Sequence, residues 1–180
     1  MTILISCSSS LFIFSNYNSA NQNTYVNLLV VADNEFYTLE ANWIGCAQDY
    51  IAEANYQFQR VDLRIFLGAT YDASKRHLLS NHVDHDTAPL DTVKTYYTPE
   101  FLDSFGSDIC VYLGGTDIVG TAQGYAWLFG TEGVVPRYTW SQMVDDADTP
   151  DLYDGSRYSR VYCVIHELGH VFGADHDQAM

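Results

Sequence analysis

The stretch HELGHVFGADHD, residues 166–177, decides how the rest of the sequence is interpreted. Its first two histidines, His166 and His170, are four positions apart, so on an α-helix their side chains lie on one face and can bind the same metal ion. Glu167 follows the first histidine and can reach a water molecule on that ion. The spacing therefore predicts a helix that carries two metal ligands and a general base.

A third ligand requires the helix to end. His176 follows His170 by six positions, and on a continuous helix it would lie ~9 Å further along the axis, on another face. Gly173 stands where a break is needed, because glycine accepts the left-handed conformation that ends helices. Three neutral imidazoles and a water make a catalytic zinc site. We therefore expect His166, His170 and His176 to hold one Zn²⁺, with Glu167 as the general base.

Short apolar segments upstream of this stretch predict a sheet. Residues 25–32 (YVNLLVVA) are rich in Val and Leu, which is typical of a buried strand. Residues 61–67 alternate between apolar and polar side chains, which indicates a half-buried strand. Residues 108–113 (DICVYL) and 124–129 (GYAWLF) are two further strand candidates.

Helical spacing appears between the first two of these strands. Apolar residues recur at steps of four and three and predict a long helix that ends near Gln59 or Arg60. Thr98 can cap a short helix that starts at Pro99 and runs through Phe105. The apolar face of the long helix consists of Leu39, Trp43, Ala47, Ile51, Ala54 and Phe58.

The remaining segments complete an α/β pattern. Ser156 or Ser159 can cap a final helix that runs to about residue 172. Residues 70–95 are polar and weakly patterned, so we expect mostly loop there, and residues 144–156 read as an acidic loop. The order strand, helix, strand, helix, strand, strand, helix favours an α/β fold with a mixed sheet.

Charge and length narrow the class of protein. The chain has 180 residues, with 23 acidic and 8 basic side chains and a net charge of −15. Nucleic acid and anionic membranes bind basic surfaces, so neither is an expected partner. No apolar run reaches the ~20 residues of a membrane helix, so no transmembrane span is expected. The sequence leaves the oligomeric state open.

Residues 1–24 form an N-terminal segment ahead of the main domain, which we place at residues 25–180. The apolar part of this segment is interrupted by serines, and it lacks the basic start of a signal peptide. Two interpretations stay open: the remnant of a targeting segment, or a first strand.

Two other groups have the chemistry of metal ligands. Residues 82–86 (HVDHD) pair imidazoles with carboxylates, but a solvated loop is the simpler interpretation. Asp145, Asp146, Asp148 and Asp151 could hold calcium, but their spacing differs from that of an EF-hand, so calcium stays unsupported. The four cysteines permit two disulfides without showing which residues pair.

The pattern H-E-x-x-H-x-x-G-x-x-H resembles that of the metzincin clan of zinc peptidases. Asp177, directly after the third histidine, is typical of the adamalysin/reprolysin group within that clan. The resemblance extends over roughly residues 25–177. The segment YVNLLVVADNEFY resembles the first strand and the start of the long helix, VDLRIFLGAT resembles the second strand, and TAQGYAWLFG resembles the edge strand that lines the substrate cleft.

The resemblance implies a zincin catalytic domain of α/β class, with a twisted mixed sheet, a long helix and an active-site helix. The implied activity is zinc-dependent endopeptidase action outside the cell or at the cell surface. The polypeptide substrate would bind as an extended strand along residues 124–129. The alternative is a catalytically silent metal-binding domain that recognises proteins. Glu167 favours an enzyme, because a silent relative needs no general base beside its ligands.

Three features depart from the family pattern. Thr131 stands near a position where many members have a cysteine, so their disulfides cannot be transferred to this chain. Cys163 lies in the active-site helix, three residues before His166. The Met-turn, which lies beneath the zinc in this clan, is not visible, because Met180 follows His176 too closely. We therefore expect the C-terminal subdomain to be missing from this sequence.

Overall fold

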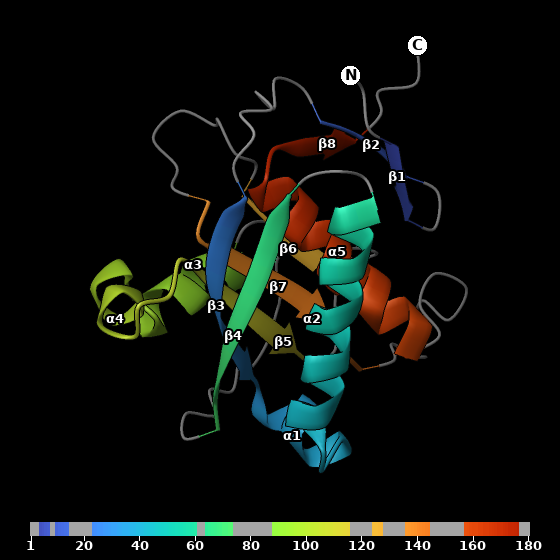
Figure 1. The fold of residues 1–180 in the computed structure, drawn as a ribbon. Coiled ribbons are helices and arrows are strands. Elements are labelled where there is room, and N and C mark those ends of the chain that lie inside the picture. The colour runs from blue at the N-terminus through green and yellow to red at the C-terminus, as the bar shows by residue number, and fades with distance from the viewer. Residues whose placement is uncertain are drawn as a thin grey trace.

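The structure is a computed structural model that describes residues 4–7, 10–14, 23–60, 64–73, 88–115, 124–127, 136–144 and 157–176. Its centre is a five-stranded sheet with helices on both faces (Figure 1). The order across the sheet is β4 (Ile65–Asp72), β3 (Thr24–Ala32), β5 (Ile109–Gly114), β7 (Tyr138–Gln142) and β6 (Gly124–Ala126). The first four are parallel, and β6 runs antiparallel to β7 at the edge. The predicted α/β fold with a mixed sheet is confirmed.

Helices cover both faces of this sheet. One face packs against α1 (Asn34–Leu39), α2 (Trp43–Arg60) and α5 (Arg157–Val171), and the other against α3 (Ala88–Tyr96) and α4 (Pro99–Ser104). Alternate residues of β3 therefore enter two separate apolar clusters. Burial on both sides explains why the sequence of β3 is almost continuously apolar.

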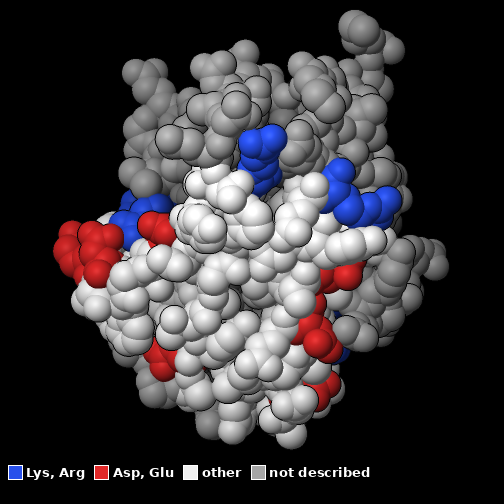
Figure 2. All heavy atoms as spheres, viewed as in Figure 1, with Lys and Arg blue, Asp and Glu red and all other residues white. Residues whose placement is uncertain are grey.

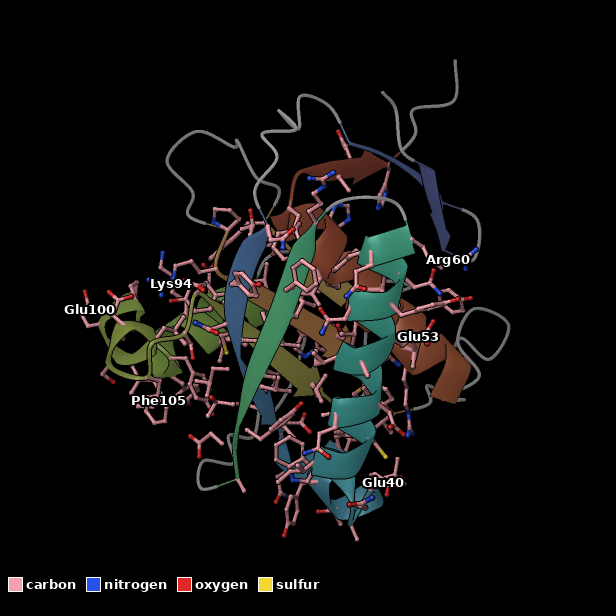
Figure 3. All side chains as sticks on the ribbon, viewed as in Figure 1. Glu40, Glu53, Arg60, Lys94, Glu100 and Phe105 are labelled. Atoms are coloured by element: carbon pink, nitrogen blue, oxygen red, sulfur yellow. The ribbon has the colours of Figure 1, made fainter. Side chains whose placement is uncertain are left out.

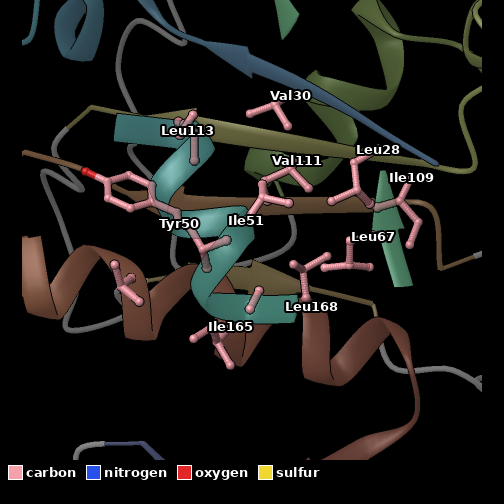
Figure 4. Close-up of a cluster of buried hydrophobic side chains, with 14 of the residues drawn as sticks. Leu28, Val30, Tyr50, Ile51, Leu67, Ile109, Val111, Leu113, Ile165 and Leu168 are labelled. Atoms are coloured by element: carbon pink, nitrogen blue, oxygen red, sulfur yellow. The ribbon is translucent and has the colours of Figure 1, made fainter. Parts of the chain in front are cut away.

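The core fixes α5 through its apolar side. Ile165 and Leu168 of α5 lie in the same buried cluster as Ile51 of α2 and Val111 of β5, and none of the four is more than 5% exposed (Figure 4). Burying one such side chain contributes roughly 1.5–3 kcal/mol. The helix that carries the HE-x-x-H motif is therefore held rigidly against the sheet.

A second, smaller sheet lies beyond the end of α5. It consists of β1 (Leu4–Cys7), β2 (Ser10–Phe14) and β8 (Ala174–His176), in the order β1-β2-β8. All its pairs are antiparallel, and Phe12 of β2 is the partner of His176. The N-terminal segment thus contains two strands. The proposed targeting remnant is an interpretation that this geometry does not test.

The long helix predicted from Leu39 onward is two helices. Asp33 caps α1, since its side chain accepts a hydrogen bond of 2.8 Å from the backbone N–H of Phe36. That helix ends at Leu39, which is 58% exposed, because Glu40 has an extended backbone. The rest of the predicted face is correct, and α2 buries it against the sheet.

Other predicted boundaries are wrong in part. Residues 70–95 were expected to be mostly loop, but β4 extends to Asp72 and α3 occupies Ala88–Tyr96, while residues 74–87 lie outside the described part of the chain. The predicted strand at residues 61–67 begins only at Ile65, and its first three residues lie outside the described part of the chain. Strand β7 was not predicted at all.

Several local predictions are confirmed. Thr98 caps α4, which begins at Pro99, and α5 ends close to the predicted residue 172. Strand β6 is shorter than predicted, and residues 128–129 lie outside the described part of the chain. Among the described residues, Cys46, Cys110 and Cys163 are thiols rather than disulfides. No described helix combines the length and apolar character of a membrane span.

Candidate metal centre

Helix α5 places His166 and His170 one turn apart on one face, with ring centroids separated by 4.9 Å. The helix ends two residues before Gly173, the glycine that the sequence singled out. Gly173 has a φ of 92°, and its N–H donates a hydrogen bond of 2.9 Å to the carbonyl of His170. The chain then reverses into β8.

Strand β8 carries His176 back over the helix. The Nε2 atom of His176 lies 3.1 Å from Nε2 of His166 and 3.1 Å from Nε2 of His170. The potential ligand atoms of the three residues all lie within 4.8 Å of one another. A tetrahedral zinc ion with bonds of ~2.0–2.1 Å sets its ligand nitrogens about 3.3 Å apart. The donor set therefore fits a single tetrahedral ion.

The hydrogen bonding of His170 orients its ring for metal binding. Its Nδ1 lies 2.8 Å from the carbonyl oxygen of Ala174, and a carbonyl can only accept, so Nδ1 carries the proton. The lone pair on Nε2 is thereby left for an ion. Burial, with the neighbouring His170 and His176, lowers the pKa of His166 to about 3. Burial also lowers the pKa of His170. These lowered pKa values favour the neutral rings that metal binding requires.

Glu167 projects from α5 toward the edge strand β6. It is 3% exposed, and burial raises the pKa of its carboxyl well above the ordinary value. A Cβ atom added at Gly124 would lie 2.7 Å from both Cγ and Cδ of Glu167. The absence of a side chain at Gly124 is therefore what gives the glutamate its room between helix and strand.

Strand β6 is an edge with pairing on one side. In the described part of the chain it pairs with β7 alone, through Gly124↔Ser141, Tyr125↔Trp140 and Ala126↔Thr139. Its residues are half-buried. An extended polypeptide could add as one more strand along the outer side of such an edge.

The structure brings the three predicted ligands together, and Glu167 lies next to His166 on α5. Sequence reasoning missed two contributors: Gly124 as the neighbour of Glu167, and β2 as the partner strand of His176. Of these two, only Gly124 had a signal in the sequence, because it belongs to the segment TAQGYAWLFG that resembles an edge strand. Residues 82–86 and the acidic residues at 145–151 lie outside the described residues.

Three converging imidazoles next to a buried glutamate form a donor set that could hold a metal ion. The chain belongs to metallo-peptidase family M12, whose reprolysin-type family model matches residues 22–180. The predicted resemblance to the adamalysin/reprolysin group is therefore confirmed. No curated protein sequence matches the chain significantly.

Two solved structures were found to be similar to this chain. One, a structure of a chaperone-substrate complex, has a TM-score of 0.54 and 15% identity, and covers 91% of this chain and 26% of the other. The second, the metalloproteinase-II from Bacteroides fragilis, has a TM-score of 0.48 and 17% identity, and covers 89% of this chain and 46% of the other. The chain thus spans less than half the length of either. The expected subdomain after Met180 stays a prediction.

Proposed function

We propose that this chain is a zinc-dependent endopeptidase in which His166, His170 and His176 hold the ion and Glu167 is the general base. The observation that carries the proposal is the convergence of three Nε2 atoms beside a buried glutamate. Zinc, when bound, would lower the pKa of a water and polarise the substrate carbonyl. An extracellular or cell-surface location is part of the proposal, since the sequence predicts it and the fold does not test it.

Residues of the chain would transfer the proton and position the substrate. Glu167 would accept the proton of the attacking water and pass it to the leaving amine. Burial raises the pKa of Glu167, so it holds that proton more firmly than an exposed carboxylate would. The outer edge of β6 would bind the substrate backbone, and α5, packed against the sheet, would hold the ligands and the base in position.

The test compares Glu167→Ala with His170→Ala and the unchanged chain. Zinc content is measured by elemental analysis and turnover with a quenched fluorescent peptide mixture. We expect Glu167→Ala to retain one zinc per chain and to lose turnover by roughly 10²–10⁴-fold, because the ligands stay and the proton path is removed. His170→Ala should lose zinc and turnover together.

The alternative function is a silent metal-binding domain that recognises proteins. It predicts that the unchanged chain binds zinc and peptides but cleaves none of them. Near-normal cleavage by Glu167→Ala would instead rule out Glu167 as the base while leaving the metal site in place.

A further inference from the structure

The edge strand β6 presents two chemically different faces. Gly124 and Ala126 face α5 and the metal centre, whereas Tyr125 and Trp127 face the side covered by α3. The ring of Trp127 lies 5.9 Å from that of Tyr138 at 90°, which continues the β6–β7 register by one residue. A strand added along β6 would therefore place alternate side chains on these two faces.

A lysine stands at the rim of the aromatic face. The ammonium of Lys94, on α3, lies 5.4 Å from the centroid of the Trp127 ring, a cation–π distance. Lys94 is exposed, and within the described residues no carboxylate lies at ion-pair distance from it. Since the chain has only 8 basic side chains against 23 acidic ones, a positive charge beside the edge strand is an unusual local feature.

The direction of the substrate follows from Glu167. The glutamate lies against Gly124, so the scissile bond would lie beside the start of β6. A substrate strand antiparallel to β6 would pass Trp127 with residues that precede this bond. Opposed side chains in such a pair are ~4.5–5.5 Å apart at Cβ, so a glutamate side chain facing Trp127 can reach the ammonium of Lys94.

We propose that Lys94 and Trp127 form a subsite that selects an acidic side chain on the amino-terminal side of the scissile bond. This inference rests on the proposed function, because it assumes that a polypeptide pairs with β6. An exposed ion pair has a modest effect, so the expected preference for Glu over Gln is roughly two- to fivefold. It should weaken as salt screens the charges.

The experiment measures binding apart from cleavage. The zinc-loaded Glu167→Ala protein is titrated with labelled peptides that carry either Glu or Gln at successive positions, and affinity is measured by fluorescence anisotropy. Cleavage of the same peptides by the unchanged chain then locates the scissile bond by mass spectrometry. We expect one position before that bond at which Glu binds two- to fivefold more tightly than Gln.

Arg60 provides a matched control for Lys94. Its guanidinium lies 5.6 Å from the ring centroid of Tyr56, so it is also a cation over an aromatic ring, but on α2 (Figure 3). Lys94→Gln should abolish the preference for Glu, and Lys94→Glu should replace it with a preference for Lys. Arg60→Gln should leave the preference unchanged.

The outcomes separate the inference from the function on which it rests. If no peptide binds or is cleaved, both fail. If Glu and Gln peptides bind equally, or Lys94→Gln keeps the preference, the cleft remains a peptide site and the subsite is wrong. A second copy of the chain on β6 would appear as a dimer in sedimentation that peptide does not dissociate, and would also overturn the inference.

Discussion

Gly124 is a single residue whose missing side chain sets the position of Glu167. Gly124→Ala would bring a Cβ atom to 2.7 Å from Cγ and Cδ of Glu167. The glutamate side chain can rotate away, so we expect little loss of stability. A displacement of ~1 Å in a catalytic group can cost ~10²-fold in rate, so turnover should fall while zinc is retained.

Gly68→Ala on β4 is the control for this substitution. It also adds a methyl group to an edge strand, with its nearest contact at 3.1 Å from the side-chain oxygen of Asn27, but it lies away from the metal centre. Turnover and zinc content are measured for both variants. Unchanged turnover in Gly124→Ala would show that the position of Glu167 does not depend on this glycine.

Asp33 should make stability depend on pH. Burial raises the pKa of its carboxyl to about 6 from 3.8, although hydrogen bonds from the backbone of Phe36 and Gly115 oppose the shift. In the pH window between 3.8 and about 6, Asp33 therefore holds a proton in the folded protein that it has released in the unfolded chain. The free energy of unfolding should fall as pH rises through it, by roughly 1–3 kcal/mol.

The comparison variant is Asp33→Asn, which does not titrate. The free energy of unfolding in urea is measured for both proteins at pH 4 and pH 7. At each pH the value for the variant is subtracted from the value for the unchanged chain, so that the contributions of other titrating groups cancel. The difference should decrease from pH 4 to pH 7. A difference that is constant or increases with pH would contradict the predicted shift.

At the scale of elements, β2 supports the strand that carries the third histidine. Strand β8 is short, and its described partner is β2, with Phe12 opposite His176 and Ile13 opposite Asp175. A proline in β2 removes a backbone donor and disrupts this pairing. We expect zinc affinity to fall by ~10-fold, as when a contact that orients a metal ligand is lost.

Successive amides of a strand point to opposite sides, so Phe12→Pro and Ile13→Pro are compared, and one of them removes a donor that faces β8. Ser6→Pro on β1 is the control, because β1 pairs with β2 but not with β8. Zinc affinity is measured by competition with a chelating dye. Equal affinities in all three variants would show that β8 holds His176 without help from β2.

Local signals explain which elements the sequence predicted. Gly173 predicts where α5 ends, and Thr98 and Pro99 predict where α4 begins. The effects of these residues act within a turn or two of the helix. Strand β7 escaped prediction because Thr139 and Ser141 are polar yet fully buried, which breaks the apolar signal of a strand. Their burial depends on α5 covering that face of the sheet, which no local window of sequence contains.

In the candidate site, too, local features could be predicted from the sequence and long-range contacts could not. Its ligands and base could be predicted because they lie within eleven consecutive residues, 166–176. The pairing of β2 with β8 and the contact of Gly124 with Glu167 join segments far apart in the chain. Such pairings depend on the order of strands in the sheets, which the spacing of residues does not contain.

For the whole molecule, the net charge of −15 predicts that salt stabilises the fold. On the face in Figure 2, basic side chains lie in the upper part of the described surface, and acidic ones lie mostly along its margins and below. An ion pair joins Arg137 and Asp103, but acidic side chains outnumber basic ones by 23 to 8 in the sequence. Screening should therefore remove more repulsion than attraction.

We expect the melting temperature to rise as NaCl goes from about 0.01 to 0.3 M, where the screening length falls from ~30 Å to below 10 Å. A gain of roughly 1 kcal/mol would raise it by about 2–4 °C in a chain of this length. Sucrose at equal osmolality controls for effects of solute exclusion. The same salt range should weaken the preference for acidic peptides at Lys94, because that interaction is an attraction between opposite charges. A melting temperature that falls with salt would show that attractive pairs, rather than repulsion among the carboxylates, dominate the electrostatics of this protein.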